Sequence, residues 1–189
     1  MSSTAYDIFQ RHRLTVAEYH RMAETGILVQ DARVELIEGE VIDMPPIGSL
    51  HAGTVDYLAD VLRLPCDGRA IVRTQNPLFL SLHSEPQPDI ALLRPRPDFY
   101  RSAHPTPADV FLIVEAADTT LAYDTQIKLP LYARHGVPEV WLADLPNRRF
   151  IVHRTPTPAG FQDVQTLTDL SAVTPLLLPG VSIDLSDLF

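Results

Sequence analysis

Apolar residues recur along this chain with the spacing of amphipathic helices in three segments. Thr15 is followed three residues later by Glu18, the capping-box signature of a short helix that should end near Gly26. A second helix is predicted over residues 50–62, whose apolar positions share one helical face: Val55, Leu58, Ala59 and Leu62.

The third helix is predicted over residues 126–135. Gly136 and then Pro138 supply stop signals after it. Pro130 limits where this helix can begin, because proline is tolerated only in the first helical turn. Lys128 is therefore expected close to the N-terminal end of the helix.

Short apolar runs between turn residues predict a series of β-strands. Residues 34–37 and 40–44, joined by Glu38-Gly39, are typical of a β-hairpin. The apolar run Val110–Val114 is typical of a buried central strand. Further strands are predicted over residues 70–73, 78–82, 90–93, 140–143 and 150–153.

Helices interleaved with apolar strands favour a layered α/β fold, with a mixed central β-sheet flanked by helices. The length of 189 residues suits one domain, since domains usually hold about 100–200 residues. Within it, residues 1–13 are expected to be a polar lead-in. Residues 155–189 are expected to form a proline-rich extension, with short strands, that packs on the core.

Composition narrows the possible classes of protein. The net charge of −9 argues against a protein that coats nucleic acid, because contacts to phosphates need a high density of positive charge. An enzyme that binds DNA only transiently can still work with a small basic patch and a metal ion. The single cysteine, Cys66, excludes intrachain disulfides and Cys-based zinc sites. The chain has neither a signal-peptide pattern nor the roughly 18 consecutive apolar residues of a membrane helix, so we expect a cytoplasmic protein without a membrane partner.

Two carboxylates next to apolar strands are the first candidates for chemistry. Asp89 follows Pro88 and opens the strand 90–93, but Pro-Asp is also ordinary turn chemistry. Glu115 ends the apolar run 110–114, where burial requires a partner. That partner can be a backbone N–H, a lysine or a divalent cation. Two carboxylates from neighbouring strands would offer Mg²⁺ the hard oxygen ligands that it prefers.

Lys128 can complete such a site. On its own it could be a solvated helix residue paired with Asp124 at i, i+4. A cation near a helix N-terminus, however, opposes the helix dipole, which favours a functional reason. A lysine beside a metal ion can orient or deprotonate water, or stabilise the transition state.

The chain resembles the PD-(D/E)XK nuclease superfamily, and within it the bacterial "putative restriction endonuclease" domain family. The segments that carry the resemblance span about residues 14–154 in order: Glu35-Leu36-Ile37-Glu38-Gly39-Glu40, Ser49-Leu50-His51, Gln87-Pro88-Asp89-Ile90-Ala91, Ile113-Val114-Glu115, and Lys128 through Trp141-Leu142-Ala143-Asp144. The resemblance implies a restriction-endonuclease-like three-layer core with an N-terminal hairpin.

The resemblance also implies roles for individual residues. Asp89 and Glu115 would be the ligands of Mg²⁺, for which Mn²⁺ could substitute, and Lys128 would be the catalytic lysine. The usual Glu-x-Lys pattern is broken at Ala117, so the lysine has moved into the next helix. Glu35 would approach the metal as an accessory catalytic residue.

Other residues are candidates for substrate binding. His51 and Gln87 would line the cleft, although a helix start and a turn would also explain them. Arg94 and Arg96 could grip phosphates on either side of the cut, or simply belong to a solvated loop that holds four prolines, residues 94–109.

The sequence therefore predicts an Mg²⁺-dependent endonuclease that hydrolyses phosphodiesters in DNA, acting as a homodimer because cutting two strands usually takes two sites. One alternative is an inactive nuclease-fold module that binds a partner. Another is a metal-independent hydrolase that uses Asp89 and Glu115 as an acid/base pair on a sugar. Motifs for P-loop NTPases, His-Glu-x-x-His metalloproteases and Gly-x-Ser-x-Gly hydrolases are absent.

Overall fold

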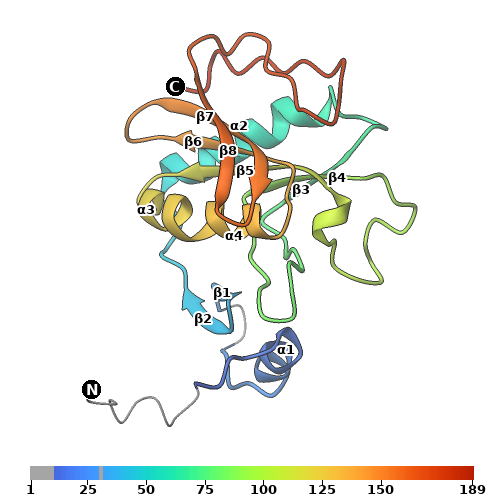
Figure 1. The fold of residues 1–189 in the computed structure, drawn as a ribbon, viewed down its shortest axis with the longest axis vertical. Helices are drawn as coiled ribbons and strands as arrows, with labels where there is room; N and C mark the ends of the chain where they lie inside the picture. The colour runs from blue at the N-terminus through green and yellow to red at the C-terminus, as the bar shows by residue number, and fades with distance from the viewer. Residues whose placement is uncertain (1–10, 30–31) are drawn as a thin grey trace.

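The computed structural model describes residues 11–29 and 32–189, so most of the predicted lead-in, residues 1–13, lies outside the described residues. Its centre is a six-stranded sheet in the order β3-β4-β5-β6-β7-β8 (Figure 1). Only β5 and β6 pair in parallel, and the other neighbours are antiparallel. The strands are β3 (Ile71–Thr74), β4 (Ile90–Leu93), β5 (Val110–Ala117), β6 (Glu139–Asp144), β7 (Arg149–Thr157) and β8 (Gly160–Leu167).

The sheet lies between two helical layers, which confirms the three-layer fold. Helix α2 (Ser49–Arg63) packs on one face and α4 (Leu129–Arg134) on the other (Figure 1). Successive side chains of a strand point to opposite faces, so β5 contributes Leu112 and Val114 to the α2 side and Ile113 to the α4 side. All eight residues of β5 are buried, as expected for a central strand with helices on both faces.

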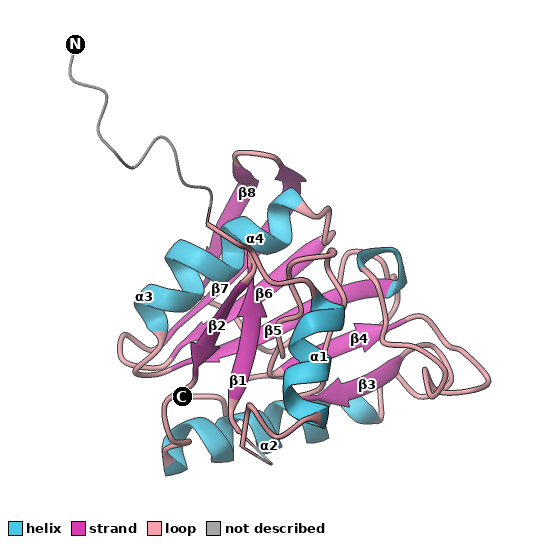
Figure 2. Ribbon diagram, turned by 90° about the horizontal axis from the view of Figure 1, so that it is seen from below, coloured by secondary structure: helices cyan, strands magenta, loops and turns pink. Residues whose placement is uncertain are grey.

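The N-terminal elements lie at one end of the molecule. They are α1 (Val16–Glu24) and a hairpin of β1 (Val34–Ile37) and β2 (Glu40–Asp43). The capping box predicted at Thr15 and Glu18 is present. The hairpin turn is also confirmed: Glu38 and Gly39 have φ of 51° and 85°, the positive values of a tight hairpin turn. Viewed from the α1 end, the hairpin lies in front of the sheet (Figure 2).

The predicted strand over residues 78–82 is wrong. Those residues instead form a loop that folds back on itself, with the N–H of Leu78 bonded to Pro86 and that of Leu80 bonded to Ser84. Prolines cannot donate to a strand ladder, and Pro77, Pro86 and Pro88 flank this segment. The loop runs from the sheet to α1, where the N–H of Val16 donates to Leu82 at 2.8 Å.

The helix predicted over residues 126–135 begins earlier than expected. A continuous helical stretch consists of α3 (Leu121–Tyr123), a π-helical segment η3 (Asp124–Lys128) and α4. The N–H of Leu129 donates to the carbonyl of Asp124, five residues back. The wider π turn accommodates Pro130, which has no N–H to donate. Lys128 therefore lies inside a helical stretch, and the expectation that it opposes a helix N-terminus is wrong.

The C-terminal part of the chain is more regular than predicted. The strand expected over 150–153 extends through Pro156 as β7 and forms a hairpin with β8, a strand of eight residues. Beyond it, apolar residues enter the core on the α2 side: Val173, Leu178, Val181, Ile183 and Leu185. Buried Glu139 helps to hold this segment, because it accepts hydrogen bonds from Trp141, Arg154 and the backbone of Leu176. None of the helices described here is long and apolar enough to cross a membrane.

Candidate active site

Two carboxylates meet where β4 and β5 lie side by side. Asp89 directly precedes β4, and Glu115 lies in β5 next to Val114, the partner of Ile90. The N–H of Asp89 donates to Glu115 Oε2 at 3.2 Å, and the N–H of Ala116 donates to Asp89 Oδ2 at 2.9 Å. The backbone N–H of Asp89 thus holds the carboxylate of Glu115, and the backbone N–H of Ala116 holds the carboxylate of Asp89.

Lys128 reaches the same place from the helical stretch. Its Nζ lies 3.0 Å from Glu115 Oε1 and 3.4 Å from Glu35 Oε1. The side chains are almost fully buried, with 4% of Lys128 exposed and less of the two glutamates. Strands β1 and β5 and the π-helical segment therefore bring three ionisable groups into one buried cluster.

The charges of this cluster shift several pKa values. Burial raises the pKa of Glu115 to about 8, although the ammonium of Lys128 opposes the rise. Burial disfavours the ammonium of Lys128, but the charges of Glu115 and Glu35 outweigh it and hold its pKa well above the usual value. For Asp89, burial favours the neutral acid, but His51 and Lys128 outweigh it and lower the pKa. The two strand carboxylates are thus shifted in opposite directions.

His51, in the first turn of α2, bridges the two strands. Its Nε2 lies 3.1 Å from Asp89 Oδ1, and its Nδ1 lies 2.8 Å from the carbonyl oxygen of Ala116. Because both neighbours are acceptors, both ring nitrogens must donate to satisfy them, which is the pattern of an imidazolium. Accordingly, the hydrogen bond to Asp89 raises the pKa of His51.

Gln87 fixes the position of Glu35. Its backbone N–H donates to Glu35 Oε1 at 2.8 Å, and its side chain donates to the carbonyl of Val34 at 3.3 Å. Glu35 has only 2% of its surface exposed, so these contacts and Lys128 define the position of its carboxylate. Gln87 therefore links the loop before β4 to β1.

Tyr132 is a site residue that the sequence reasoning missed. Its hydroxyl donates to Glu115 Oε1 at 2.6 Å, and the side chain is fully buried. Tyr132 lies four residues after Lys128, a spacing that puts both on one helical face and could have revealed it. Asp124, the partner expected for Lys128, instead accepts a hydrogen bond from Thr120 at 2.7 Å. The π-helical segment alters the i, i+4 geometry on which that expectation relied.

A cavity of about 260 Å³ opens over these groups. Its lining includes Glu35, His51, Gln87, Asp89, Glu115 and Lys128, together with Gln75, whose side chain donates to Asp89 Oδ1 at 3.3 Å. The cluster can therefore be reached by a ligand. The rest of the lining comes from the start of the hairpin, the segment between the hairpin and α2, the turn after β5 and the π-helical segment: Arg33, Val34, Met44, Pro45, Pro46, Ile47, Gly48, Asp118, Thr119, Thr120 and Asp124.

Arg94 and Arg96 are not brought to this cavity. The Arg94 guanidinium lies 4.9 Å from the ring centre of Phe111, and that of Arg96 lies 4.8 Å from the ring centre of Tyr100. Arg96 also pairs with Asp98 at 2.7 Å. The Arg94 contact reaches β5, and the Arg96 contacts stay within the proline-rich loop, so the predicted role in gripping phosphate has no support from the arrangement.

The cavity has an excess of negative charge. Its lining holds two side chains with permanent positive charge, Arg33 and Lys128, against a larger set of carboxylates: Glu35, Asp89, Glu115, Asp118 and Asp124. Carboxylate oxygens are the donors that Mg²⁺ and Mn²⁺ prefer, and an excess of them needs a cation for neutrality. The donor set therefore fits a divalent ion, with Asp89 and Glu115 as the residues that could hold it.

Comparison with known proteins agrees with this geometry. The sequence matches the family described as "Putative restriction endonuclease" (Uma2) over residues 16–186. This chain belongs to that family. A similar solved structure is the "putative nuclease belonging to DUF820" from Anabaena variabilis, with a TM-score of 0.69 and 17% identity over 93% of this chain and 97% of that one. At that identity the likeness concerns the fold. No curated protein matches the sequence.

For this member of the Uma2 family, we predict that Lys128→Met destabilises the metal-free protein. The substitution leaves Glu35 and Glu115 buried without their counter-ion, so the free energy of unfolding at neutral pH should fall by about 3–5 kcal/mol. The loss should grow between about pH 5 and pH 9, because Lys128 lowers the pKa of Glu115, and without it the folded protein keeps a proton that the unfolded chain releases. Urea unfolding in EDTA at several pH values in this range measures the loss in the free energy of unfolding.

Arg134→Met is the matched control, because Arg134 pairs with Glu38 at 3.0 Å on the surface. Its cost should stay below about 1 kcal/mol, as is usual for exposed ion pairs. A loss for Lys128→Met that is equally small, or that does not change with pH, would contradict the buried ion cluster.

Proposed function

We propose that this protein is an Mg²⁺-dependent nuclease that hydrolyses phosphodiester bonds in DNA. The observation that carries the proposal is the convergence of Asp89, Glu115 and Lys128 on one cavity with an excess of carboxylates. Membership of a family described as restriction endonucleases supports it.

In this proposal, Asp89 and Glu115 hold the cation from adjacent strands. When bound, Mg²⁺ supplies positive charge that polarises the phosphodiester and lowers the pKa of a water molecule. Glu115 is kept in place by Tyr132, whose hydroxyl donates to Oε1 at 2.6 Å. The two strands are fixed by reciprocal backbone contacts, so little reorganisation is needed on binding.

Lys128 acts through its positive charge. Its pKa lies well above the usual value, so it is an ammonium at neutral pH and can donate hydrogen bonds to a phosphate oxygen. Glu35 positions it, since Oε1 of Glu35 lies 3.4 Å from Nζ. His51 and Gln87 line the same cavity and are proposed to contact the substrate.

A second candidate function has one observation in its favour. The raised pKa of Glu115 and the lowered pKa of Asp89 are the pattern of an acid/base pair, as in a metal-independent glycosidase. However, the cavity lining holds more carboxylates than permanent cations, which favours a cation site over an acid/base pair. Activity that persists in EDTA would favour this second function.

We predict that the purified protein nicks plasmid DNA in Mg²⁺ or Mn²⁺ and not in EDTA. Asp89→Asn, Glu115→Gln and Lys128→Met should each lower the rate by about 100-fold or more, because the first two remove a proposed metal ligand and the third removes the ammonium proposed to contact the phosphate. Arg134→Met serves as the control with unchanged activity. Full activity of Asp89→Asn in a preparation free of wild-type protein would overturn the assignment.

We also predict that Mg²⁺ binding releases protons at neutral pH. With a pKa near 8, Glu115 is mostly protonated before binding and must ionise to become a ligand. The apparent affinity should therefore rise between about pH 6 and pH 8 and then level off. Calorimetry in buffers of different ionisation enthalpy measures the release, and Glu115→Gln should abolish it. Binding heats that are the same in all buffers would refute the link to Glu115.

The expected homodimer stays a prediction, as does the cytoplasmic location. Several apolar residues of the proline-rich extension, Ile183 and Leu185 among them, are used in the chain's own core, which leaves fewer of them for pairing with a second copy. Size-exclusion chromatography with light scattering tests the state directly. A dimer mass is expected, and a mass of 21.1 kDa at all concentrations would exclude it.

A further inference from the structure

We infer that His20, Glu85 and His104 form a second metal site, for a divalent transition-metal ion such as Zn²⁺. One potential ligand atom from each residue lies within 4.8 Å of the other two. None of the three residues belongs to the lining of the cavity around Asp89 and Glu115. The proposal therefore concerns a centre separate from the one proposed for DNA cleavage.

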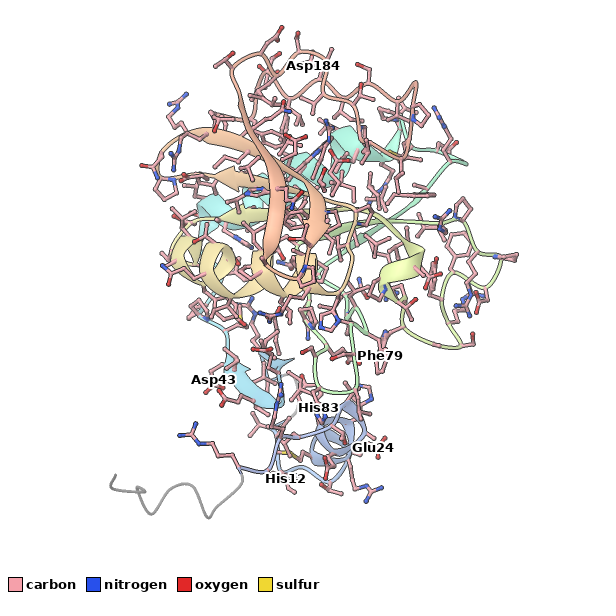
Figure 3. The ribbon with its side chains drawn as sticks, in the orientation of Figure 1. His12, Glu24, Asp43, Phe79, His83 and Asp184 are labelled. Atoms are coloured by element: carbon pink, nitrogen blue, oxygen red, sulfur yellow. The ribbon has the colours of Figure 1, made fainter. Side chains whose placement is uncertain are left out.

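The three residues come from separate segments that meet near α1. His20 lies in α1, Glu85 in the loop before β4, and His104 in the proline-rich loop after β4. The loop that holds Glu85 also contains His83, labelled in Figure 3 near the labelled Glu24 of α1. Backbone hydrogen bonds hold both loops in place. The N–H of Glu85 donates to the carbonyl of Leu36 at 2.7 Å, and the carbonyl of Pro105 accepts from the N–H of Phe79 at 2.9 Å.

Glu85 is a buried carboxylate with little to neutralise it. Only 3% of the residue is exposed, and its ion-pair partner among the described residues is His20, with Nε2 at 2.7 Å from Oε1. No lysine or arginine within residues 11–29 and 32–189 pairs with it. Burying a carboxylate without a lysine or arginine partner costs free energy unless another cation is present.

Two buried atoms of the cluster also lack hydrogen-bond partners. They are Glu85 Oε2 and His104 Nδ1, both unpaired within the part of the chain that the structure describes. Native proteins satisfy nearly all buried polar atoms, so such atoms call for a missing partner. A metal ion would serve both, because carboxylate oxygens and imidazole nitrogens are its ligand atoms.

The donor set indicates which metal is expected. Two imidazoles with one carboxylate are typical of zinc and its neighbours among the transition metals, whereas Mg²⁺ prefers oxygen ligands throughout. Ligand atoms around tetrahedral Zn²⁺ lie about 3.3 Å apart, given bonds of roughly 2.0–2.1 Å. The spread of up to 4.8 Å can close by rotation of His20, whose side chain is 43% exposed.

Such a centre would tie α1 to the strand that carries Glu35. Residue Glu85 bridges Leu36 of β1, next to Glu35, and the hydroxyl of Tyr19 donates to the carbonyl of Val34 at 3.0 Å. A metal bound by His20 and Glu85 would join α1 and β1 by a further contact. Its role in this proposal is structural, with one coordination position left to solvent.

The test uses untagged full-length protein freed of metal with EDTA. Calorimetric titration with Zn²⁺ should give one tight equivalent, and Zn²⁺ should raise the melting temperature. Co²⁺ should give visible absorption bands of a low-coordinate site, without a thiolate band because Cys66 lies in the core beside α2. Glu85→Gln and His104→Ala should weaken Zn²⁺ binding by about 100-fold or more and abolish the melting shift.

Matched variants separate this site from others. His12→Ala removes an exposed histidine and should bind Zn²⁺ as the wild type does, whereas Asp89→Asn alters the catalytic cavity and should keep the tight equivalent at His20, Glu85 and His104. Tight binding lost in Asp89→Asn but kept in Glu85→Gln would overturn the proposal, as would wild-type protein that binds no Zn²⁺. Circular dichroism checks that each variant folds. If Glu85→Gln does not fold, His20→Gln provides a milder substitution, because His20 is half-exposed.

Discussion

The ammonium of Lys128, held between Glu115 and Glu35, is the interaction on which the site depends. Each glutamate comes from a different sheet, and Lys128 from the helical stretch that covers one face of the larger sheet. Removing Lys128 leaves two buried carboxyl groups without a cation beside them. The cluster therefore joins the N-terminal hairpin to the sheet as well as forming the floor of the cavity, so stability and chemistry rest on the same three side chains.

The π-helical segment explains how Lys128 reaches that position. A regular helix over residues 121–134 would need an N–H at Pro130, which proline lacks. The wider turn at 124–128 absorbs this defect immediately before Pro130. Such segments are often found at functional sites, because they redirect a side chain without ending the helix. Here the redirected side chain is the buried lysine.

Much of the fold could be predicted from the sequence because its signals are local. The capping box at Thr15, the Glu38-Gly39 turn and the apolar run 110–114 each specify their own geometry. The errors arose where local signals compete: apolar residues 78–82 are flanked by prolines, and Pro130 is accommodated by a π turn. The resemblance singled out Asp89, Glu115 and Lys128. Tyr132 could have been suspected from its helical spacing to Lys128, but its hydrogen bond to Glu115 is seen only in the structure.

The charge of the cavity also reconciles an acidic protein with a nucleic-acid substrate. A lining with more carboxylates than permanent cations repels phosphate while Asp89 and Glu115 have no metal. Burial keeps Glu115 mostly neutral near pH 7, which removes part of that repulsion. A neutral Glu115, however, is not available as a metal ligand. In the proposed function, a divalent ion would recruit the ionised glutamate and offset much of the negative charge of the lining. Cation binding and substrate binding should therefore be coupled, so the overall charge of −9 does not decide whether DNA can enter the site.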